Sequence, residues 1–588
     1  MPGLSAGCAH HGKPLRGLMS TPKSRSFEGR FGRMFPLPAA TYGKTEIESR
    51  NALMALGSAM TSTFDAPKDG QDAEESGIPA LYTYFGQFID HDITFDPTST
   101  LLRHGDPEAL TDFRTPALDL DNMYGRGPDD QPYMYDNNGT KFLLGNNLAN
   151  LAPDLPRNNA TPARAIIGDP RNDENSIVSQ LQAMMLRFHN HVADDNPELD
   201  FHSLQKVVRW HYQWVIIHDF LPRLISKGVL DGVKTAGRYD QTKLRFYHWK
   251  NDPFMPVEFS VAAYRLGHSM IRSGYRLNDD DTTLLPVFPI PETVAGAPPG
   301  GILSGLTGFQ AMAPNRGIDW GRFIDIEEPR AYGGDPDDVK PPTEDMRRRL
   351  QFAYRLDTSV VTPLSVLPAS VVSDEPRSLA QRNLLRAFEL GLPTGQSVAK
   401  AMGVVPLADN QIKIGKAVDV PGDGDVLGFI SDLPQLSAFR GKCPLWTYIL
   451  AEAMSNQTTV TIPVTPGTTV STPQLGQVGG RIVAEVFLGM LFGDSTSFLS
   501  ADPLWTPTIG NMKSDFALRD IVSYAMGLKS RASIPVAPAS KSGIATAPQT
   551  NGVQTNGVHV DSADSLADTV AALHANMQQL QVHLSLVT

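Results

Sequence analysis

Residues 86–92, with the sequence GQFIDHD, place one histidine between two carboxylates. Gln87 precedes His91 by four residues, so the two side chains share a face if the segment is helical. A histidine beside an amide can accept a proton from a bound molecule and return it to a departing oxygen atom. The chain has 14 histidines, and a single one is more often a hydrogen-bonded structural residue, so this motif needs partners elsewhere.

A cationic partner is offered by residues 168–174, GDPRNDE, which come directly before a helical pattern. The Arg171 guanidinium could stabilise the negative charge that develops on oxygen when a peroxide bond is cleaved. The alternative is an ordinary loop arginine that pairs with Asp169 or Asp173 of the same segment.

A second histidine lies in residues 264–270, YRLGHSM. A neutral imidazole such as that of His268 is a common axial ligand of haem iron. Arg265, three residues earlier, could pair with a haem propionate, and Gly267 allows a large group to approach the backbone. The functional interpretation depends on whether His91 and His268 face one another across a single haem.

These ordered motifs run from about residue 75 to about residue 528 and resemble the animal-type haem peroxidase family of the peroxidase–cyclooxygenase superfamily, the group of myeloperoxidase, lactoperoxidase and peroxinectin. The resemblance implies a mainly α fold, with one large helical domain, long loops and little β structure. It implies distal catalysis by His91, Arg171 and Gln87. The candidate haem-binding residues are Asp90, Glu174, Arg265, His268 and Asn383.

Within that set the resemblance separates the roles. His268 matches the proximal iron ligand, and Asp90 and Glu174 match two carboxylates that are ester-linked to the haem. Asn383 lies eight residues before a Gly-Leu-Pro sequence, as does the family asparagine that receives the proximal imidazole hydrogen bond.

Residues 115–125, TPALDLDNMYG, resemble the calcium loop of the same family. Hard oxygen ligands from side chains and backbone suit calcium. The implied ligands are Asp92, Thr115, the Ala117 carbonyl, Asp119 and Asp121. The family usually has a serine where Asp121 stands, and the extra carboxylate is expected to keep or tighten the site. Taken alone, the segment would be a solvated acidic turn.

Two departures from the family pattern are visible. Asn175 stands where myeloperoxidase has a methionine bonded to the haem vinyl group, so we expect no third covalent link and no strong chloride oxidation. Only Cys8 and Cys443 are present, which excludes a disulfide framework and suits a reducing compartment. With no secretory pattern in the first 35 residues, we expect a cytoplasmic or non-classically exported protein of a bacterial-type branch.

Charge and hydropathy exclude two classes of partner. The formal net charge is −12 and no basic stripe stands out, so nucleic acid is not expected. No segment approaches the roughly 20 apolar residues that span a bilayer, so no membrane span is expected.

Composition divides the chain into an N-terminal arm (1–45), a helical peroxidase domain (46–529), a flexible linker (530–561) and a short coiled-coil-like helix (562–588). Apolar residues from Leu566 to Val587 alternate at spacings of four and three, which predicts a coiled-coil seam and a possible homo-oligomer. The alternative is a helix that docks back onto the main domain.

Apolar periodicity predicts helices near residues 81–89, 177–192, 204–215, 258–272, 376–390, 479–492 and 515–526. Gly228 is predicted to end the third helix, and Ser514 and Gly527 to begin and end the last one. Between helices lie long loops at 96–170 and 278–340, and the Thr- and Val-rich stretch 458–472 predicts a small hairpin.

Three functions are compatible with these motifs. The leading one is a haem peroxidase that uses hydrogen peroxide to oxidise small donors such as bromide, iodide, thiocyanate or phenols. The first alternative is a fatty-acid dioxygenase of the cyclooxygenase-related group. Those enzymes need a tyrosine three residues before the proximal histidine, where this chain has Arg265, with Tyr264 one residue earlier. The second alternative is a non-catalytic, calcium-stabilised oligomeric scaffold.

Overall fold

The computed structural model describes residues 29–528, apart from 70–71, 96–110, 113, 149–151, 327–348, 370, 373, 419–424, 426–427, 463–467 and 510–514. The linker and heptad helix predicted for residues 530–588 lie outside the described residues, as does most of the N-terminal arm. Their assignments therefore stay predictions.

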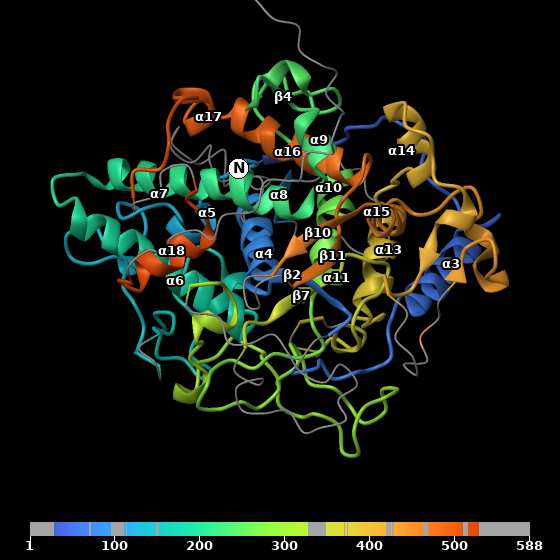
Figure 1. Ribbon diagram of the computed structural model, residues 1–588. Coiled ribbons are helices and arrows are strands. Elements are labelled where there is room, and N and C mark those ends of the chain that lie inside the picture. Colours follow the sequence, from blue (N-terminus) through green and yellow to red (C-terminus); the bar gives the residue numbers. More distant parts are fainter. Residues whose placement is uncertain are drawn as a thin grey trace, which may run out of the picture. The chain divides into compact units, whose positions relative to one another are not determined.

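The described chain is built mainly from α-helices joined by long irregular segments, which confirms the predicted mainly α class (Figure 1). The α-helices are α3 (Glu46–Ala59), α4 (Leu81–Ile93), α5 (Asp121–Tyr124), α6 (Ser176–Asp195), α7 (Phe201–Val215), α8 (Leu221–Leu224), α9 (Lys227–Asp231), α10 (Val257–Ser260), α11 (Gly267–Met270), α13 (Leu379–Glu389), α14 (Gly395–Met402), α15 (Leu445–Met454), α16 (Gly479–Gly493), α17 (Phe498–Ala501) and α18 (Leu518–Ala525).

The strands are short and form small sheets. In one, β1 (Gly29–Gly32) pairs antiparallel with β3 (Thr111–Asp112) and parallel with β6 (Met255–Pro256). The antiparallel pairs are β2 (Glu75–Pro79) with β7 (Phe352–Tyr354), β4 (Lys234–Thr235) with β5 (Arg238–Tyr239), β8 (Lys413–Ile414) with β9 (Gly428–Phe429), and β10 (Gln457–Thr461) with β11 (Thr469–Pro473). The last pair confirms the predicted hairpin.

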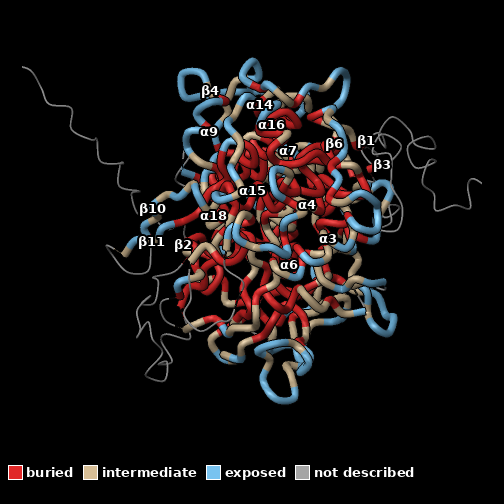
Figure 2. The backbone as a smooth tube through the Cα atoms, turned by 90° about the vertical axis from the view of Figure 1, so that its right-hand side faces the viewer, coloured by how far each residue is buried: buried red, intermediate tan, exposed pale blue. Residues whose placement is uncertain are grey.

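Helix α4 lies in the middle of the described helices and is mostly buried (Figures 1 and 2). The apolar residues that predicted it, Leu81, Phe85, Phe88 and Ile89, are all fully buried. It packs against α6, which in turn packs against α7 and α18. This burial is what makes α4 a rigid support, because packing rather than intrinsic propensity supplies most of a helix's stability.

Most of the predicted helices are present, with boundaries shifted by a few residues. Gly527 has φ of +70° directly after the C-cap of α18, as the prediction of a glycine stop required. No helix in the described part of the chain combines the length and apolar character needed to cross a membrane.

Two local predictions were wrong. Gly228 does not end the third helix: the helical run from α7 continues through a π-helical turn, η6 (Ile216–Phe220), and α8 to Leu224, and Gly228 lies inside α9. Residues 258–272 do not form one helix but split into α10, the 3₁₀ helix η8 (Ala263–Leu266) and α11. A periodicity of apolar residues does not distinguish these tighter and wider turns from an α-helix.

The start of α18 also differs from the prediction. Its N-cap is Ala517, whose backbone N–H donates to the Asp520 carboxylate at 2.9 Å, and Ser514 lies outside the described residues.

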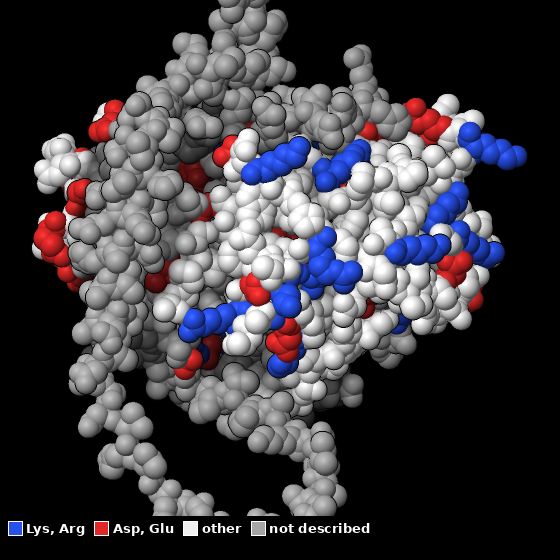
Figure 3. Space-filling model, turned by 90° about the horizontal axis from the view of Figure 1, so that it is seen from above, with Lys and Arg blue, Asp and Glu red and all other residues white. Residues whose placement is uncertain are grey.

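On the face of the molecule shown in Figure 3, Lys and Arg side chains are separated by uncharged surface, with acidic side chains beside several of them. The described residues of that face therefore form no continuous basic surface.

Candidate active site

One cavity of about 300 Å³ collects the histidines, arginines and carboxylates that the sequence singled out. Its lining includes Gln87, Asp90, His91, Arg171, Glu174, Arg265 and His268. These residues come from three segments that are distant in sequence: α4, the region of the 3₁₀ helix η5 (Pro170–Asp173), and the η8–α11 region. The volume falls at the lower end of the range typical of small-molecule and cofactor sites.

Helix α4 carries Gln87, Asp90 and His91 to the cavity wall. Its first turn has no side-chain cap; instead the Leu81 N–H donates to the Phe323 carbonyl at 3.0 Å, so tertiary contacts fix the helix start. Gly86 faces Phe220, whose ring would lie 3.2 Å from an added Cβ. Glycine at this position therefore allows α4 to approach the π-helical turn closely.

The His91 ring is oriented by two buried amides. Its Nδ1 lies 2.7 Å from Asn172 Oδ1, and Asn172 Nδ2 donates to Gln182 Oε1 at 2.8 Å. Because the Asn172 amide nitrogen is already used as a donor, its oxygen accepts from Nδ1–H, and Nε2 of the neutral ring keeps a lone pair. Burial, and after it the charge of Arg171, lowers the pKa of His91 to about 4. His91 is therefore neutral at pH 7.

Arg171 is held in place by several acceptors. Its Nη2 donates to Asp169 Oδ2 at 2.8 Å and to the carbonyls of His91 and Thr94 at 3.1 and 2.7 Å. Its guanidinium also lies 4.5 Å from the centroid of the Phe95 ring. Arg171 therefore does pair with Asp169, as the alternative interpretation held, but it also lines the cavity.

Asp169 links two arginines under this part of the cavity. Arg114 Nε donates to its carboxylate at 2.9 Å, in addition to the bonds from Arg171. Burial alone would raise the pKa of Asp169, but Arg171 and Arg114 more than offset this and hold it well below its usual range. The carboxylate is thus charged at all moderate pH values and keeps the Arg171 guanidinium fixed.

A second polar group of the cavity consists of Gln87, Glu174 and Asn175. Gln87 Nε2 donates to Glu174 Oε1, and Asn175 Nδ2 donates to Gln87 Oε1 at 3.2 Å. Asn175 also caps α6, because its Oδ1 accepts from the N–H groups of Ile177 and Val178. Burial is the main reason why the pKa of Glu174 rises to about 7.

His268 lies on α11 and contacts Asn383 of α13. Asn383 Nδ2 is 2.7 Å from His268 Nδ1, so in this orientation the amide donates to Nδ1. Turned by 180°, the amide would present its oxygen, accept from Nδ1–H and leave Nε2 free to bind a metal. Burial, with a smaller contribution from Arg265, lowers the pKa of His268 to about 3, so the ring is a neutral donor at pH 7. Arg265 itself donates from Nε to the Ser260 carbonyl at 2.8 Å.

The lining fits a haem group. A neutral imidazole with a fixed second nitrogen is available as an axial ligand. Arg265 offers a cation for an acidic substituent. The remaining wall is largely apolar, as the flat face of a porphyrin requires; it includes Leu266, Ile271, Phe288, Leu364 and Leu367.

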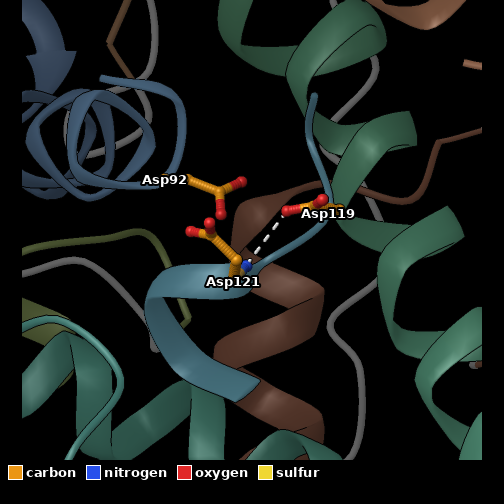
Figure 4. A group of neighbouring side chains, drawn as sticks. All are labelled: Asp92, Asp119 and Asp121. Carbon is orange, nitrogen blue, oxygen red and sulfur yellow. Dashed lines mark hydrogen bonds between the residues drawn. The ribbon is translucent and has the colours of Figure 1, made fainter. Parts of the chain in front are cut away.

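Three carboxylates, from α4, from the segment before α5 and from the first residue of α5, form a second cluster of acidic groups. Ligand oxygens of Asp92, Asp119 and Asp121 all lie within 4.8 Å of one another (Figure 4). The Asp121 N–H donates to Asp119 Oδ1 at 3.2 Å, and Tyr212 of α7 donates to Asp92 Oδ2 at 3.1 Å. Asp92 Oδ1 is buried and accepts no hydrogen bond from the described residues. Leu120 has φ of 61°, and this left-handed turn separates Asp119 from Asp121 along the chain.

The electrostatics of this group favour a bound cation. Burial, and then mutual repulsion, raises the pKa values of Asp92 and Asp121 well above the usual range, and burial raises the pKa of Asp119 to about 6. Arg114 partly offsets this, with its Nη1 3.5 Å from Asp121 Oδ1. Of the other predicted ligands, Thr115 lies beside the group, because its N–H is 3.5 Å from Asp121 Oδ2, and the Ala117 N–H donates to the Thr115 carbonyl at 2.7 Å.

Part of the chain is similar to known proteins. The family model described as animal haem peroxidase matches residues 102–294, which include Arg171, Glu174 and His268. A peroxidase-like protein of Margaritifera margaritifera is 30% identical over 116 residues, 18% of this chain and 14% of that protein. Chorion peroxidase of Drosophila melanogaster is 26% identical over 135 residues, 22% of this chain and 17% of that protein. The chain thus matches less than a fifth of the length of these relatives.

The fold has a counterpart in peroxidase A from Dictyostelium discoideum. The TM-score is 0.50 at 14% identity, over 80% of this chain and 88% of that chain. The helical class and the family model agree: residues 102–294 are similar to the animal haem peroxidase domain.

Asn172, Asp169 and Gln182 hold His91 and Arg171 through side-chain contacts. The sequence analysis named Asp169 as a pairing partner of Arg171 but did not single out Asn172 or Gln182. Asn172 and Asp169 lie within two residues of Arg171 in the same motif, and that adjacency was a usable signal. Gln182 lies two helical turns into α6 among apolar residues, and nothing in the sequence distinguishes it.

Proposed function

We propose that the chain is a haem peroxidase that reduces hydrogen peroxide and oxidises small donors such as halides, thiocyanate or phenols. The observation that carries the proposal is that two neutral histidines, His91 and His268, line one cavity together with Arg171. A bound haem would supply the iron that accepts peroxide and the electrons that reduce it. The protein residues supply proton transfer, charge stabilisation and orientation.

His91 is the proposed acid–base residue. With Nδ1–H held by Asn172, its Nε2 can take the proton from one peroxide oxygen and deliver it to the other as the O–O bond breaks. Arg171 would stabilise the negative charge on the departing oxygen, because Asp169 and two backbone carbonyls keep its guanidinium fixed. Gln87, tied to Glu174 and Asn175, would orient the bound molecule.

His268, which lines the same cavity, would bind the iron through Nε2. Asn383, whose Nδ2 is 2.7 Å from His268 Nδ1, would make the ring a stronger donor once its amide is turned to accept from Nδ1–H. Arg265 would pair with a propionate. Asp90 and Glu174 both line the cavity and are the candidates for ester links to the haem. Mass spectrometry of haem released by acid tests the last point: free, unmodified haem would rule out the ester links.

The absorption spectrum of the purified protein, before and after hydrogen peroxide is added, tests the central proposal. We expect a Soret band from bound haem that shifts after peroxide and returns when iodide or a phenol is added. A protein with no Soret band after reconstitution with haem, or with no response to peroxide, would instead support the scaffold alternative.

The pH dependence of the peroxide reaction follows from the state of His91. The ring must be unprotonated to accept a proton, and its pKa is lowered to about 4, so the rate constant should be constant near neutral pH and fall below about pH 4. Stopped-flow absorbance measures it, with circular dichroism at each pH as the control for folding. Because the charge of Arg171 contributes to the lowered pKa, Arg171→Gln should move the midpoint to higher pH. A midpoint near the ordinary value of about 6.5 in the unmodified protein would contradict this assignment.

Fatty-acid oxygenation is the second candidate function. Tyr264 lines the same cavity, and its hydroxyl donates to the Gly86 carbonyl at 3.2 Å. An apolar wall beside a tyrosine is compatible with an acyl chain. Oxygen uptake with linoleate, abolished by Tyr264→Phe, would favour this function over peroxidase activity.

We also propose that Asp92, Thr115, Ala117, Asp119 and Asp121 bind calcium. At about 100 times its dissociation constant, calcium should stabilise the protein by about 2.7 kcal/mol. Without calcium, Asp119→Asn should be more stable than the unmodified protein, because it removes one of three mutually repelling carboxylates. With calcium the order should reverse.

Thermal unfolding in calcium and in EDTA measures both effects. Asp252→Asn, at an exposed position, is the matched control and should respond to calcium like the unmodified protein. An unfolding temperature that does not depend on calcium would remove the proposed site.

A further inference from the structure

Three tyrosines line the cavity, and they differ in what their hydroxyl groups contact. The Tyr264 hydroxyl donates to a backbone carbonyl. Tyr84 lies beside Tyr275, with ring centroids 5.5 Å apart. Tyr82 alone among the three donates to a carboxylate, Asp219 Oδ2, at 2.6 Å. The difference matters for redox chemistry, because a phenol that loses one electron becomes a strong acid and must pass its proton to a base.

Asp219 is presented to Tyr82 by the π-helical turn η6. A π-turn inserts one extra residue into a helix and so changes which side chains face inward, and such turns are frequent at functional sites. Here His218 is exposed, Asp219 reaches Tyr82, and Phe220 lines the cavity. Three successive residues therefore connect the surface, the carboxylate and the cavity.

Arg223 completes the arrangement on the outer side. Its Nη2 is 2.8 Å from Asp219 Oδ1, and its guanidinium lies 4.3 Å from the centroid of the Tyr82 ring. The Leu518 N–H donates to Asp219 Oδ2 at 2.9 Å. Tyr82 is 2% exposed and Asp219 8%, whereas the Arg223 side chain is 35% exposed. The Arg223 side chain thus lies between solvent and Tyr82, a buried tyrosine of the cavity wall.

We propose that Tyr82 and Asp219 form a one-electron relay between the cavity and the surface at Arg223. A one-electron oxidant in the cavity removes an electron from Tyr82, and the phenol proton moves to Asp219 Oδ2 along the 2.6 Å hydrogen bond. The products are a neutral tyrosyl radical and a neutral carboxylic acid. A donor at the surface then returns one electron, the proton moves back to Tyr82, and the donor leaves oxidised by one electron.

The relay rests on the proposed peroxidase function in one respect: the oxidant in the cavity would be the haem after its reaction with peroxide. Its substrates would be phenolic donors too large to enter the cavity, which dock on the surface over Arg223. Arg223 favours return of the proton from Asp219 to Tyr82. While Asp219 is protonated, its carboxyl group is neutral and no longer balances the positive charge of the Arg223 guanidinium.

The first experiment needs no haem. Azide radicals generated by pulse radiolysis oxidise tyrosine in the full-length protein, and the tyrosyl radical is followed by its optical absorption. We expect a long-lived fraction that is lost in Tyr82→Phe and in Asp219→Asn and retained in the matched variant Tyr84→Phe. Tyr82→Phe keeps the ring packing, and circular dichroism checks the fold of each variant.

A long-lived radical that survives Tyr82→Phe would overturn the relay. So would one that is lost in Tyr82→Phe yet unchanged in Asp219→Asn, because the carboxylate would then play no part in holding the proton.

The second experiment adds peroxide to the haem-loaded protein and detects the radical by electron paramagnetic resonance in the same variants. If peroxide produces no spectral change while the radiolysis result holds, the peroxidase proposal fails and the relay stands. If peroxide reacts normally but the radical is unaffected by Tyr82→Phe, the relay fails and the peroxidase proposal stands.

Discussion

Replacement of His91 by alanine is expected to slow the reaction with hydrogen peroxide by about 10²- to 10⁴-fold while haem stays bound. The reason is that His91 is the proposed base of the cavity, with its Nδ1 fixed on Asn172 and its pKa lowered to about 4. Its loss removes proton transfer but leaves His268 and Asn383 unchanged. Stopped-flow absorbance gives the rate constant, and the Soret absorbance relative to protein gives the haem content.

The matched control is His248→Ala, because His248 is exposed and its ring lies 3.0 Å from the Arg245 carbonyl, away from the residues that line the cavity. Asn172→Ala should cause a smaller loss than His91→Ala, since the base would remain but lose its orientation. A rate constant for His91→Ala within a few-fold of the unmodified protein would show that the proton is transferred elsewhere.

Replacement of His268 by alanine is expected to impair haem binding itself, whereas replacement of His91 should leave haem bound. Removal of an outer partner of a metal ligand typically costs roughly 10–100-fold in affinity, and removal of the ligand should cost more. If ester links to Asp90 and Glu174 are present, the haem would remain attached, and the loss would appear as a changed axial-ligand spectrum rather than as lower content. Absorption spectroscopy after haem reconstitution measures both outcomes.

Added imidazole distinguishes a ligand role from a structural one. A ligand bound in the space left by the His268 ring should restore the spectrum of His268→Ala, whereas a misfolded variant would not recover. Asn383→Ala should keep the haem and show a weaker axial ligand, because the contact of 2.7 Å with His268 Nδ1 would be lost. A His268→Ala protein with an unaltered haem spectrum would place the iron ligand elsewhere.

Several features of the site could be predicted from residue spacing. The four-residue interval between Gln87 and His91 determines that they share a face of α4, and the helix is where the apolar pattern placed it. Asp92, one residue further, lies on another face and reaches Asp119 and Asp121. The spacing of residues within one helix is sufficient to predict which side chains share a face, because it depends on that helix alone.

Other features could not be read from spacing. The third helix was predicted to end at a glycine, but a π-turn carries the helical run to Leu224, and this turn is what brings Asp219 to Tyr82. Likewise, Gln182 is one polar residue on the mostly buried helix α6, and only its contact with Asn172 gives it a role. Hydrogen bonds between distant elements depend on how helices pack, and apolar pattern does not encode them.

By itself, the sequence determined the mainly α class, the hairpin, the family resemblance and the residue types available for proton transfer, iron ligation and calcium binding. The tertiary structure decided that His91 and His268 share one cavity, which nitrogen of His91 is free, and which of three tyrosines has a base beside it. The physical reason is that residue type and spacing fix the chemistry and the face of each element. Distance, burial and hydrogen-bond partners, which set pKa values and tautomers, exist only once the elements pack together.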